Sequence, residues 1–252
     1  MAETDPFARD GVATSSAVRR LDLILVMDCT GSMKWVSTIL KANLSNIVVG
    51  FAEHRIKVNV GLMEFRDALV EHQRDIAFNF HEWKNENTLT DDVGEVAEAV
   101  SNLKFKGGGD NGAESSLDAI WHAAFHDDWT EGARRVLCVF TDDRPHEPDE
   151  TIQSVGDLVN RLTELDIYAM GMFTKYQEPY EGLVMTRNAH GLLRVYWSDL
   201  GIAKDEEELK EQLGQFVEFT SESFDEHDAT TPDILEEDDG EGDGADNPFL
   251  SF

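Results

Sequence analysis

Apolar segments alternate with helical segments along residues 19–220, and this alternation constrains the fold more than any other feature of the sequence. Strands are predicted at residues 21–27, 57–65, 135–141, 167–173 and 192–197. Helices are predicted at residues 35–53, 91–103, 113–126, 150–165 and 206–220. Segment 75–80 alternates polar and apolar residues and is predicted to pair with 57–65 as a hairpin partner. The pattern predicts an α/β fold, with a doubly wound, mostly parallel central sheet, one antiparallel edge strand and helices on both faces.

The composition divides the chain into three parts. Residues 1–18 are polar without periodicity and are expected to form a leader or short arm, and residues 19–220 form the domain. From Glu222 onward the chain has twelve acidic residues and no Lys or Arg, so residues 221–252 are predicted to be a disordered acidic tail. The chain has no apolar run of membrane-spanning length and no secretory signal, and its two cysteines do not suggest a disulfide framework. We therefore expect a cytoplasmic protein.

The charge of the chain is strongly negative, at −30 from 51 acidic and 21 basic residues. Such a surface repels nucleic-acid phosphates and anionic membranes, so neither is expected as a direct partner. Cationic partners and divalent metal ions would be attracted. Solubility, or life in high salt, explains the acidity equally well.

Three polar loops lie at the ends of predicted strands or at the start of a predicted helix. Asp28–Ser32 comes directly after the first strand, Gly107–Glu114 enters a helix, and Thr141–Asp143 comes directly after the strand at 135–141. In open α/β sheets ligands bind at the carboxyl ends of the strands, so these loops are expected at one edge. Their hydroxyls and carboxylates suit a hard divalent cation, Mg²⁺ first and Mn²⁺ or Ca²⁺ as alternatives. No thiolate or imidazole set indicates zinc.

These loops resemble those of a known family. Asp28-x-Thr30-x-Ser32 after an apolar strand, with Thr141-Asp142 at a later strand end, is similar to the metal-ion-dependent adhesion site of von Willebrand factor A-type domains. Gly-Gly-Gly-Asp followed closely by Glu, Thr-Asp followed by Pro-His, and Phe-Arg-Asp at 65–67 resemble the intracellular and prokaryotic branch of that family. The resemblance covers about residues 18–220 and implies a Rossmann-like fold.

The resemblance also implies a set of metal ligands. Thr30 and Ser32 match the hydroxyl ligands, and Asp28 and Asp142 match the carboxylates that contact the ion directly or through water. The third loop leaves two alternatives, because it is one residue longer than the family's Gly-Gly-Asp-x-Pro-Glu pattern and lacks the proline. Asp110 is favoured by its position after the glycines, and Glu114 by analogy to the Pro-Glu pattern.

Candidate partner contacts lie in two regions. Arg66, Asp67 and Asp143 are expected beside the metal loops, although Arg66 alternatively pairs with a carboxylate such as Asp67 or one of the metal cluster. Phe249 and Phe252 end the acidic tail, and an acidic linker with aromatic anchors can dock in a basic-rimmed pocket of a partner. The alternatives are that the tail folds back onto the domain or only adds solubility.

No catalytic motif is present: the sequence lacks a Ser-His-Asp order, His-Glu-x-x-His and a Walker-type phosphate loop, so an enzyme is not expected. The resemblance implies an intracellular adaptor that binds the Asp or Glu of a protein partner through the ion. It further implies service to an AAA+ ATPase, a kinase or phosphatase, or a defence or stress complex. The alternatives are a structural subunit whose metal only stabilises the loops, with binding through the tail, and a metal-dependent hydrolase.

Overall fold

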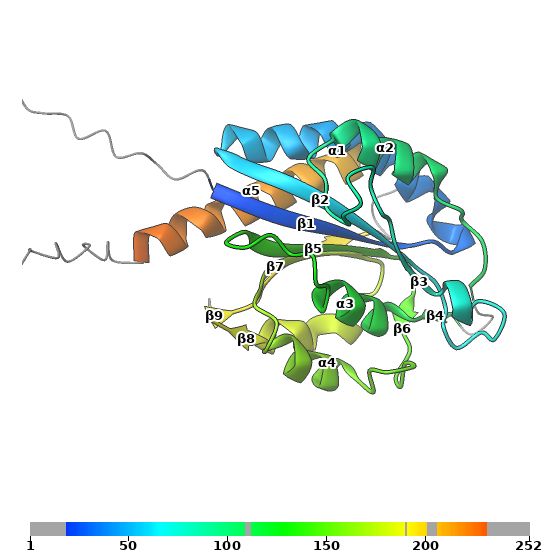
Figure 1. Ribbon diagram of the computed structural model, residues 1–252. Coiled ribbons are helices and arrows are strands. Elements are labelled where there is room, and N and C mark those ends of the chain that lie inside the picture. The colour runs from blue at the N-terminus through cyan, green and yellow to red at the C-terminus, as the bar shows by residue number, and fades with distance from the viewer. Residues whose placement is uncertain (1–18, 109–111, 190, 201–205, 231–252) are drawn as a thin grey trace, which may run out of the picture.

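The computed structural model describes residues 19–108, 112–189, 191–200 and 206–230. Its centre is a six-stranded sheet in the order β10-β7-β5-β1-β2-β3 (Figure 1). The strands are β1 Arg19–Asp28, β2 Ile56–Phe65, β3 Phe78–Phe80, β5 Arg134–Thr141, β7 Ile167–Thr174 and β10 Arg194–Asp199. All pairings are parallel except that of β3, which runs antiparallel to β2 at one edge. The predicted fold class is confirmed.

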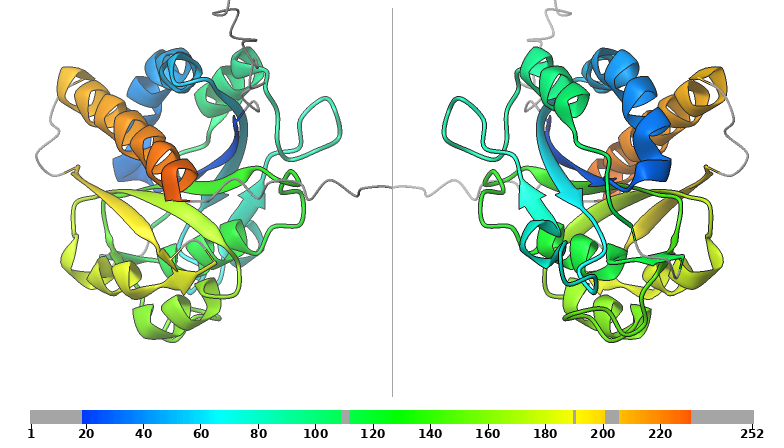
Figure 2. Two further views of the ribbon diagram at one scale, coloured as in Figure 1. Left: turned by 90° about the vertical axis from the view of Figure 1, so that its left-hand side faces the viewer. Right: turned by 90° about the vertical axis from the view of Figure 1, so that its right-hand side faces the viewer.

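Helices cover both faces of the sheet (Figure 2). One layer holds α1 Lys34–Glu53, α2 Val93–Asn102 and α5 Glu206–Thr230, and the other holds α3 Ser116–Ala124 and α4 Val155–Leu162. Single turns of 3-10 helix lie at Gly31–Met33 and Arg74–Ile76, and a longer one lies at Glu178–Met185. Two small pairs of strands complete the fold, β4 Ala113–Glu114 with β6 Arg144–Pro145, and β8 Arg187–Asn188 with β9 Gly191–Leu192.

Strand β1 shows why the sequence of a central strand is almost continuously apolar. Leu23 and Leu25 belong to the core beneath α1, α2 and α5, whereas Ile24 and Val26 belong to the core beneath α3 and α4. Successive side chains of a strand point to opposite faces, and both faces of this sheet are covered. All four side chains are at most 1% exposed.

Several predicted boundaries were wrong. The helix predicted at 113–126 begins only at Ser116, because Ala113 and Glu114 pair with Arg144 and Pro145 as β4. The helix predicted at 150–165 begins at Val155, where the Ser154 hydroxyl accepts a hydrogen bond from the N–H of Asp157 at 3.2 Å. In segment 75–80 only Phe78–Phe80 forms a strand, although the predicted antiparallel pairing with β2 is confirmed.

The last helix is longer than predicted. It continues ten residues beyond the expected end at Thr220, to Thr230. Phe224 is 2% exposed, with its ring 4.0 Å from the guanidinium carbon of Arg134 and 5.4 Å from the ring of Tyr168. These contacts stabilise a segment whose acidic composition alone predicts disorder. The leader at 1–18 and the rest of the predicted tail, 231–252, lie outside the described residues.

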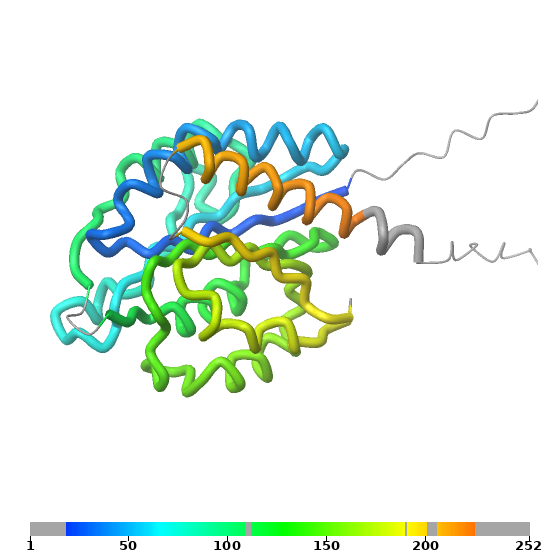
Figure 3. Tube along the Cα trace, turned by 180° about the vertical axis from the view of Figure 1, so that it is seen from behind, coloured from blue at the N-terminus to red at the C-terminus, as the bar shows by residue number. Residues whose placement is uncertain are grey.

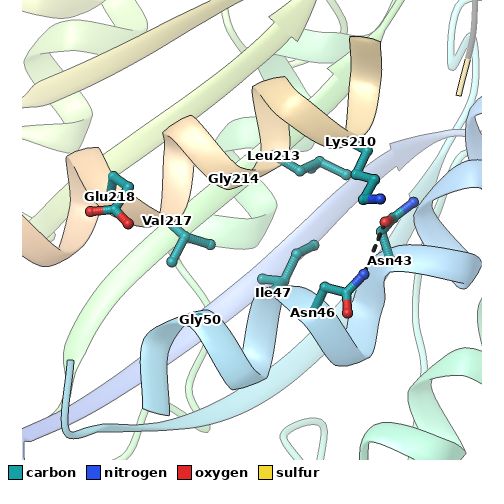
Figure 4. A pocket seen from close by; sticks show the side chains of 9 residues that line it. All are labelled: Asn43, Asn46, Ile47, Gly50, Lys210, Leu213, Gly214, Val217 and Glu218. Carbon is teal, nitrogen blue, oxygen red and sulfur yellow. Dashed lines mark hydrogen bonds between the residues drawn. The ribbon is translucent and has the colours of Figure 1, made fainter. Parts of the chain in front are cut away.

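Helix α5 packs along α1 and runs towards the end of the sheet where β1 begins (Figure 3). The two helices approach closely at Gly50, where an added Cβ would lie 3.0 Å from Val217. Towards Asn43 and Lys210 they leave a groove of about 380 Å³ (Figure 4). Within the described residues, no helix combines the length and apolar character required to cross a bilayer.

Candidate metal centre

The candidate site lies where the strand order reverses. Strand β1 has β2 on one side and β5 on the other, and its Met27 is in register with Phe140 of β5. The ends of these strands therefore place Asp28 beside Thr141 at the carboxyl edge of the sheet. This is the position at which open α/β sheets bind ligands.

Asp28 is a fully buried carboxylate. Its Oδ1 accepts the N–H of Thr30 at 2.9 Å, and its Oδ2 accepts the hydroxyl of Thr141 at 3.0 Å. The pKa of Asp28 is raised from 3.8 to about 7, mainly by burial; the hydrogen bonds from Thr30 and Thr141 lower it, and the negative charge of Asp142 adds a smaller rise. No basic side chain of the described residues contributes to this balance. A cation at this position would offset the cost of burying the charge.

The hydroxyl groups of Thr30 and Ser32 lie between Asp28 and Asp142. The Oγ1 of Thr30 lies 3.3 Å from the Oγ of Ser32, and Ser32 donates a hydrogen bond to Oδ1 of Asp142 at 2.9 Å. Thr30 is buried, Asp142 is half-buried and Ser32 is exposed. The oxygens thus extend from the interior to the surface, and the set is open on its outer side.

The third loop brings Glu114 to the same place. A Cβ added at Gly108 would lie 3.2 Å from Oε1 of Glu114 and 3.6 Å from Cβ of Thr30. Gly108 also has a φ of +103°, so this position requires glycine for both conformation and space. Glu114 is 2% exposed and is therefore a candidate ligand placed beside Thr30. Asp110, the alternative from the sequence, lies outside the described residues.

The third loop is tied to the loop that follows β5. Strands β4 and β6 pair Glu114 with Pro145, and the backbone N–H of His146 donates to the carbonyl of Glu114 at 3.1 Å. The buried His146 side chain lies 3.1 Å from Oδ1 of Asp67, in the loop after β2. Asp143 is half-buried beside these residues, and burial raises the pKa of its carboxyl group. Backbone pairing and side-chain contacts therefore connect three loops that are far apart in the sequence.

Arg66 and Asp67 have structural roles that their prediction as partner contacts did not include. Arg66 is 4% exposed, pairs with Glu64 at 2.7 Å and donates to the carbonyl of Lys104 at 2.7 Å. Asp67 is 1% exposed and accepts the N–H of Leu69 at 2.9 Å. Both side chains are buried within the domain. The alternative of an ion pair is correct for Arg66, but its partner is Glu64 rather than Asp67 or the metal cluster.

Another pair of buried carboxylates, Asp118 and Asp149, was not predicted from the sequence. Asp118 is fully buried and accepts the N–H groups of Thr151 and Ile152, each at 2.7 Å. Burial, followed by the charge of Asp118, raises the pKa of Asp149 to about 6. These carboxylates hold the loop that leads to α4. The available signal was Asp118 itself, a charged residue on the apolar face of a predicted helix.

The oxygen atoms gathered here suit a hard divalent cation. Asp28, Asp142 and Glu114 offer carboxylates, and Thr30 and Ser32 offer hydroxyls, with no sulfur or nitrogen ligand among them. In the parts of the chain that the structure describes, no three His, Cys, Asp or Glu side chains form a metal-binding group by themselves. Hydroxyl oxygens would therefore have to complete the ligand set, and metal binding stays a prediction.

An α/β sheet with polar loops at its switch point defines a Rossmann-like ligand-binding domain. The family model of the von Willebrand factor type A domain matches residues 22–191, and the chain belongs to this family. Domains of this family are commonly protein-interaction modules. No curated protein shows significant sequence similarity to the chain.

Proposed function

We propose that this domain binds a protein partner through a divalent cation, Mg²⁺ in the first instance, at the metal-ion-dependent adhesion site of the family. Asp28, Thr30, Ser32 and Asp142 would hold the ion, and Glu114 would line its third side. The observation that carries this proposal is the connected set of oxygens from Asp28 to Asp142, built from two separate loops.

The negative charge of the site explains why a partner carboxylate would need a bound cation to approach it. Asp142 already raises the pKa of Asp28, and Glu114 adds a third carboxylate beside Thr30. A partner carboxylate approaching this cluster is repelled unless a cation neutralises it. The bound ion would supply that positive charge and an open coordination position for the partner's Asp or Glu side chain.

Binding rather than catalysis is the chemistry that these residues favour. A hydrolytic site needs a base poised beside an activated water and a bound substrate. Both carboxylate oxygens of Asp28 accept hydrogen bonds, from Thr30 and Thr141, and the side chain is fully buried, so Asp28 does not face a substrate. We therefore propose an adaptor of the cytoplasm, which serves a larger complex such as an AAA+ ATPase, a kinase or phosphatase, or a defence assembly.

The test combines thermal unfolding with capture of partners. Mg²⁺ is expected to raise the melting temperature of the wild-type chain, because a ligand at 100 times its Kd stabilises by about 2.7 kcal/mol. Asp142→Asn is expected to abolish this shift and to abolish Mg²⁺-dependent capture of partners from the source cell. Asp127→Asn is the matched control, since Asp127 is an exposed carboxylate of the loop before β5 and should leave both unchanged.

Two results would contradict the proposal in different ways. An equal Mg²⁺ shift in Asp142→Asn and wild type would show that the ion binds elsewhere. A shift that disappears in the variant while capture persists in EDTA would favour the alternative, a structural metal with partner binding through other surfaces. Turnover of phosphoester or peptide substrates in Mg²⁺ or Mn²⁺ would instead identify a hydrolase.

A further inference from the structure

The β8–β9 hairpin presents one face of apolar and cationic side chains. Arg187 is in register with Leu192, and the N–H of Leu193 donates to the carbonyl of Thr186 at 2.8 Å, which extends the antiparallel pairing. Arg187 and Leu192 are directly opposite each other and therefore share one side of the hairpin. We call these two residues, together with the exposed Met185 at the end of the preceding 3-10 helix, the hairpin face. Thr186 and Leu193 turn to the opposite side and are buried, at 0% and 3% exposure.

Large apolar side chains are exposed to solvent at the hairpin face. Met185 is 68% exposed and Leu192 is 52% exposed, and the preceding Val184 is 40% exposed. The other methionines of the described residues, Met27, Met33, Met63, Met170 and Met172, are all buried. An apolar cluster of this kind on a surface indicates an interaction site.

The charge of the hairpin face indicates what it binds. Arg187 is exposed and forms no ion pair with the described residues, in a chain whose net charge is −30. A cation beside exposed Met and Leu side chains favours a segment that is both acidic and apolar. The C-terminal segment of this chain has that composition: residues 231–252 contain eight acidic residues and no Lys or Arg, and they end in Pro-Phe-Leu-Ser-Phe.

The hairpin and the end of α5 are attached to neighbouring residues of β7. The side chain of Asn188 donates to the carbonyl of Ile167, and the hydroxyl of the next residue, Tyr168, donates to the carbonyl of Ser223 in α5. Figure 1 shows the hairpin and the C-terminal turns of α5 at the same end of the sheet. The chain beyond α5 therefore begins at the end of the sheet that carries the hairpin.

The length of the C-terminal segment is sufficient to reach that face. Sixteen residues lie between Thr230 and Asn247, and a fully extended chain over these positions spans up to about 55 Å. A short flexible linker gives its end an effective concentration on the order of 1 mM. Even a contact with a Kd of about 1 mM would then be occupied about half of the time.

We propose that residues 247–252 bind the hairpin face of their own chain, with the rings of Phe249 and Phe252 against Met185 and Leu192. The acidic residues 233–246 lie against Arg187 in this arrangement. The segment covers an apolar surface that a partner with an acidic, apolar segment would otherwise occupy. This inference is independent of the metal site.

Paramagnetic relaxation in the full chain tests the contact. A nitroxide label is attached through Ser251→Cys, since the native Cys29 and Cys138 are buried and burial raises the pKa of both thiols. The Met185 methyl is expected to lose at least about half of its signal, because the contact is occupied about half of the time. The methyl of Met33, buried beside the metal loops, is the internal reference and should keep its signal.

Two variants of the labelled chain complete the test. Arg187→Glu and Phe249→Ser each are expected to restore the Met185 signal, and Arg144→Glu, a charge reversal at an exposed residue of β6, should not. The proposal is overturned if the Met185 signal is unchanged by the label or if it is not restored by Arg187→Glu. It is also overturned if the loss depends on protein concentration, which would place the segment on a second molecule. Neither outcome affects the metal-dependent proposal.

Discussion

The ion pair of Glu64 with Arg66 leads to a quantitative prediction for Glu64→Gln. Glu64 is partly buried on β2, where its Oε2 lies 2.7 Å from Arg66 and its Oε1 lies 2.9 Å from Nε2 of His81. Burial alone would raise the pKa of Glu64, but the hydrogen bonds and charges of His81 and Arg66 lower it from 4.5 to about 2. The folded state therefore favours the ionised carboxylate.

The size and the sign of the effect follow from this pKa. A difference of about 2.5 pKa units corresponds to about 3 kcal/mol of stability, which is present above the unfolded pKa of 4.5 and is lost as the pH falls towards 2. We expect Glu64→Gln to lower the free energy of unfolding by about 3 kcal/mol at neutral pH, since Arg66 then keeps a buried charge without its carboxylate. Near pH 2 the protonated wild type and the variant should be nearly equal.

Urea unfolding at several pH values measures this difference directly. Glu98→Gln is the control, because Glu98 is an exposed residue of α2 and its substitution should change stability by less than about 0.5 kcal/mol. A penalty for Glu64→Gln that stays constant from neutral to acidic pH would refute the reasoning, because it would show that shape rather than charge carries the effect.

Three further substitutions test the packing, and for each of them urea unfolding measures the loss in the free energy of unfolding. Phe224→Ala should cost about 3 to 5 kcal/mol, since the ring is buried against Arg134 and Tyr168, and an effect below about 1 kcal/mol would contradict a folded end of α5. Gly171→Ala should cost about 1 to 3 kcal/mol, because its Cβ would lie 2.7 Å from the ring of Phe216; a neutral substitution would show that Phe216 moves freely. Asp118→Asn should cost about 3 kcal/mol by losing the charge that accepts two N–H groups at 2.7 Å, and unchanged stability would mean that the loop before α4 is held otherwise.

The sheet could be predicted because its strands are buried on both faces. Segments such as 21–27 and 135–141 are apolar almost throughout, and their alternation with helices leaves few arrangements other than a parallel sheet. The loops after β1 and β5 could be placed together for the same reason, because the ends of neighbouring parallel strands share an edge. Their metal ligands stay a prediction.

Features that depend on contacts between distant segments could not be predicted. The guanidinium group of Arg66 donates to the carbonyl of Lys104, which is 38 residues away, and only the fold shows this contact. The end of α5 carries acidic residues that suggest disorder, and its burial depends on the contact of Phe224 with β5 and β7. The short β4–β6 pairing has no periodicity at all, because each strand has two residues.

The β4–β6 pairing has a consequence for which ion the site would prefer. Glu114 and the segment after Asp142 are joined by the backbone pairing of β4 with β6 and by the hydrogen bond from His146, so these two sides of the site form one hydrogen-bonded unit. The Asp28–Ser32 loop approaches this unit through side-chain bonds, Ser32 to Asp142 and Thr141 to Asp28. Mg²⁺ requires ligands at about 2.0–2.1 Å and Ca²⁺ accepts about 2.3–2.6 Å. At the proposed metal site, the discrimination between small and large ions would depend on the distance between this unit and the Asp28–Ser32 loop, and substitutions that stiffen or loosen that loop should change the ion selectivity before they change the fold.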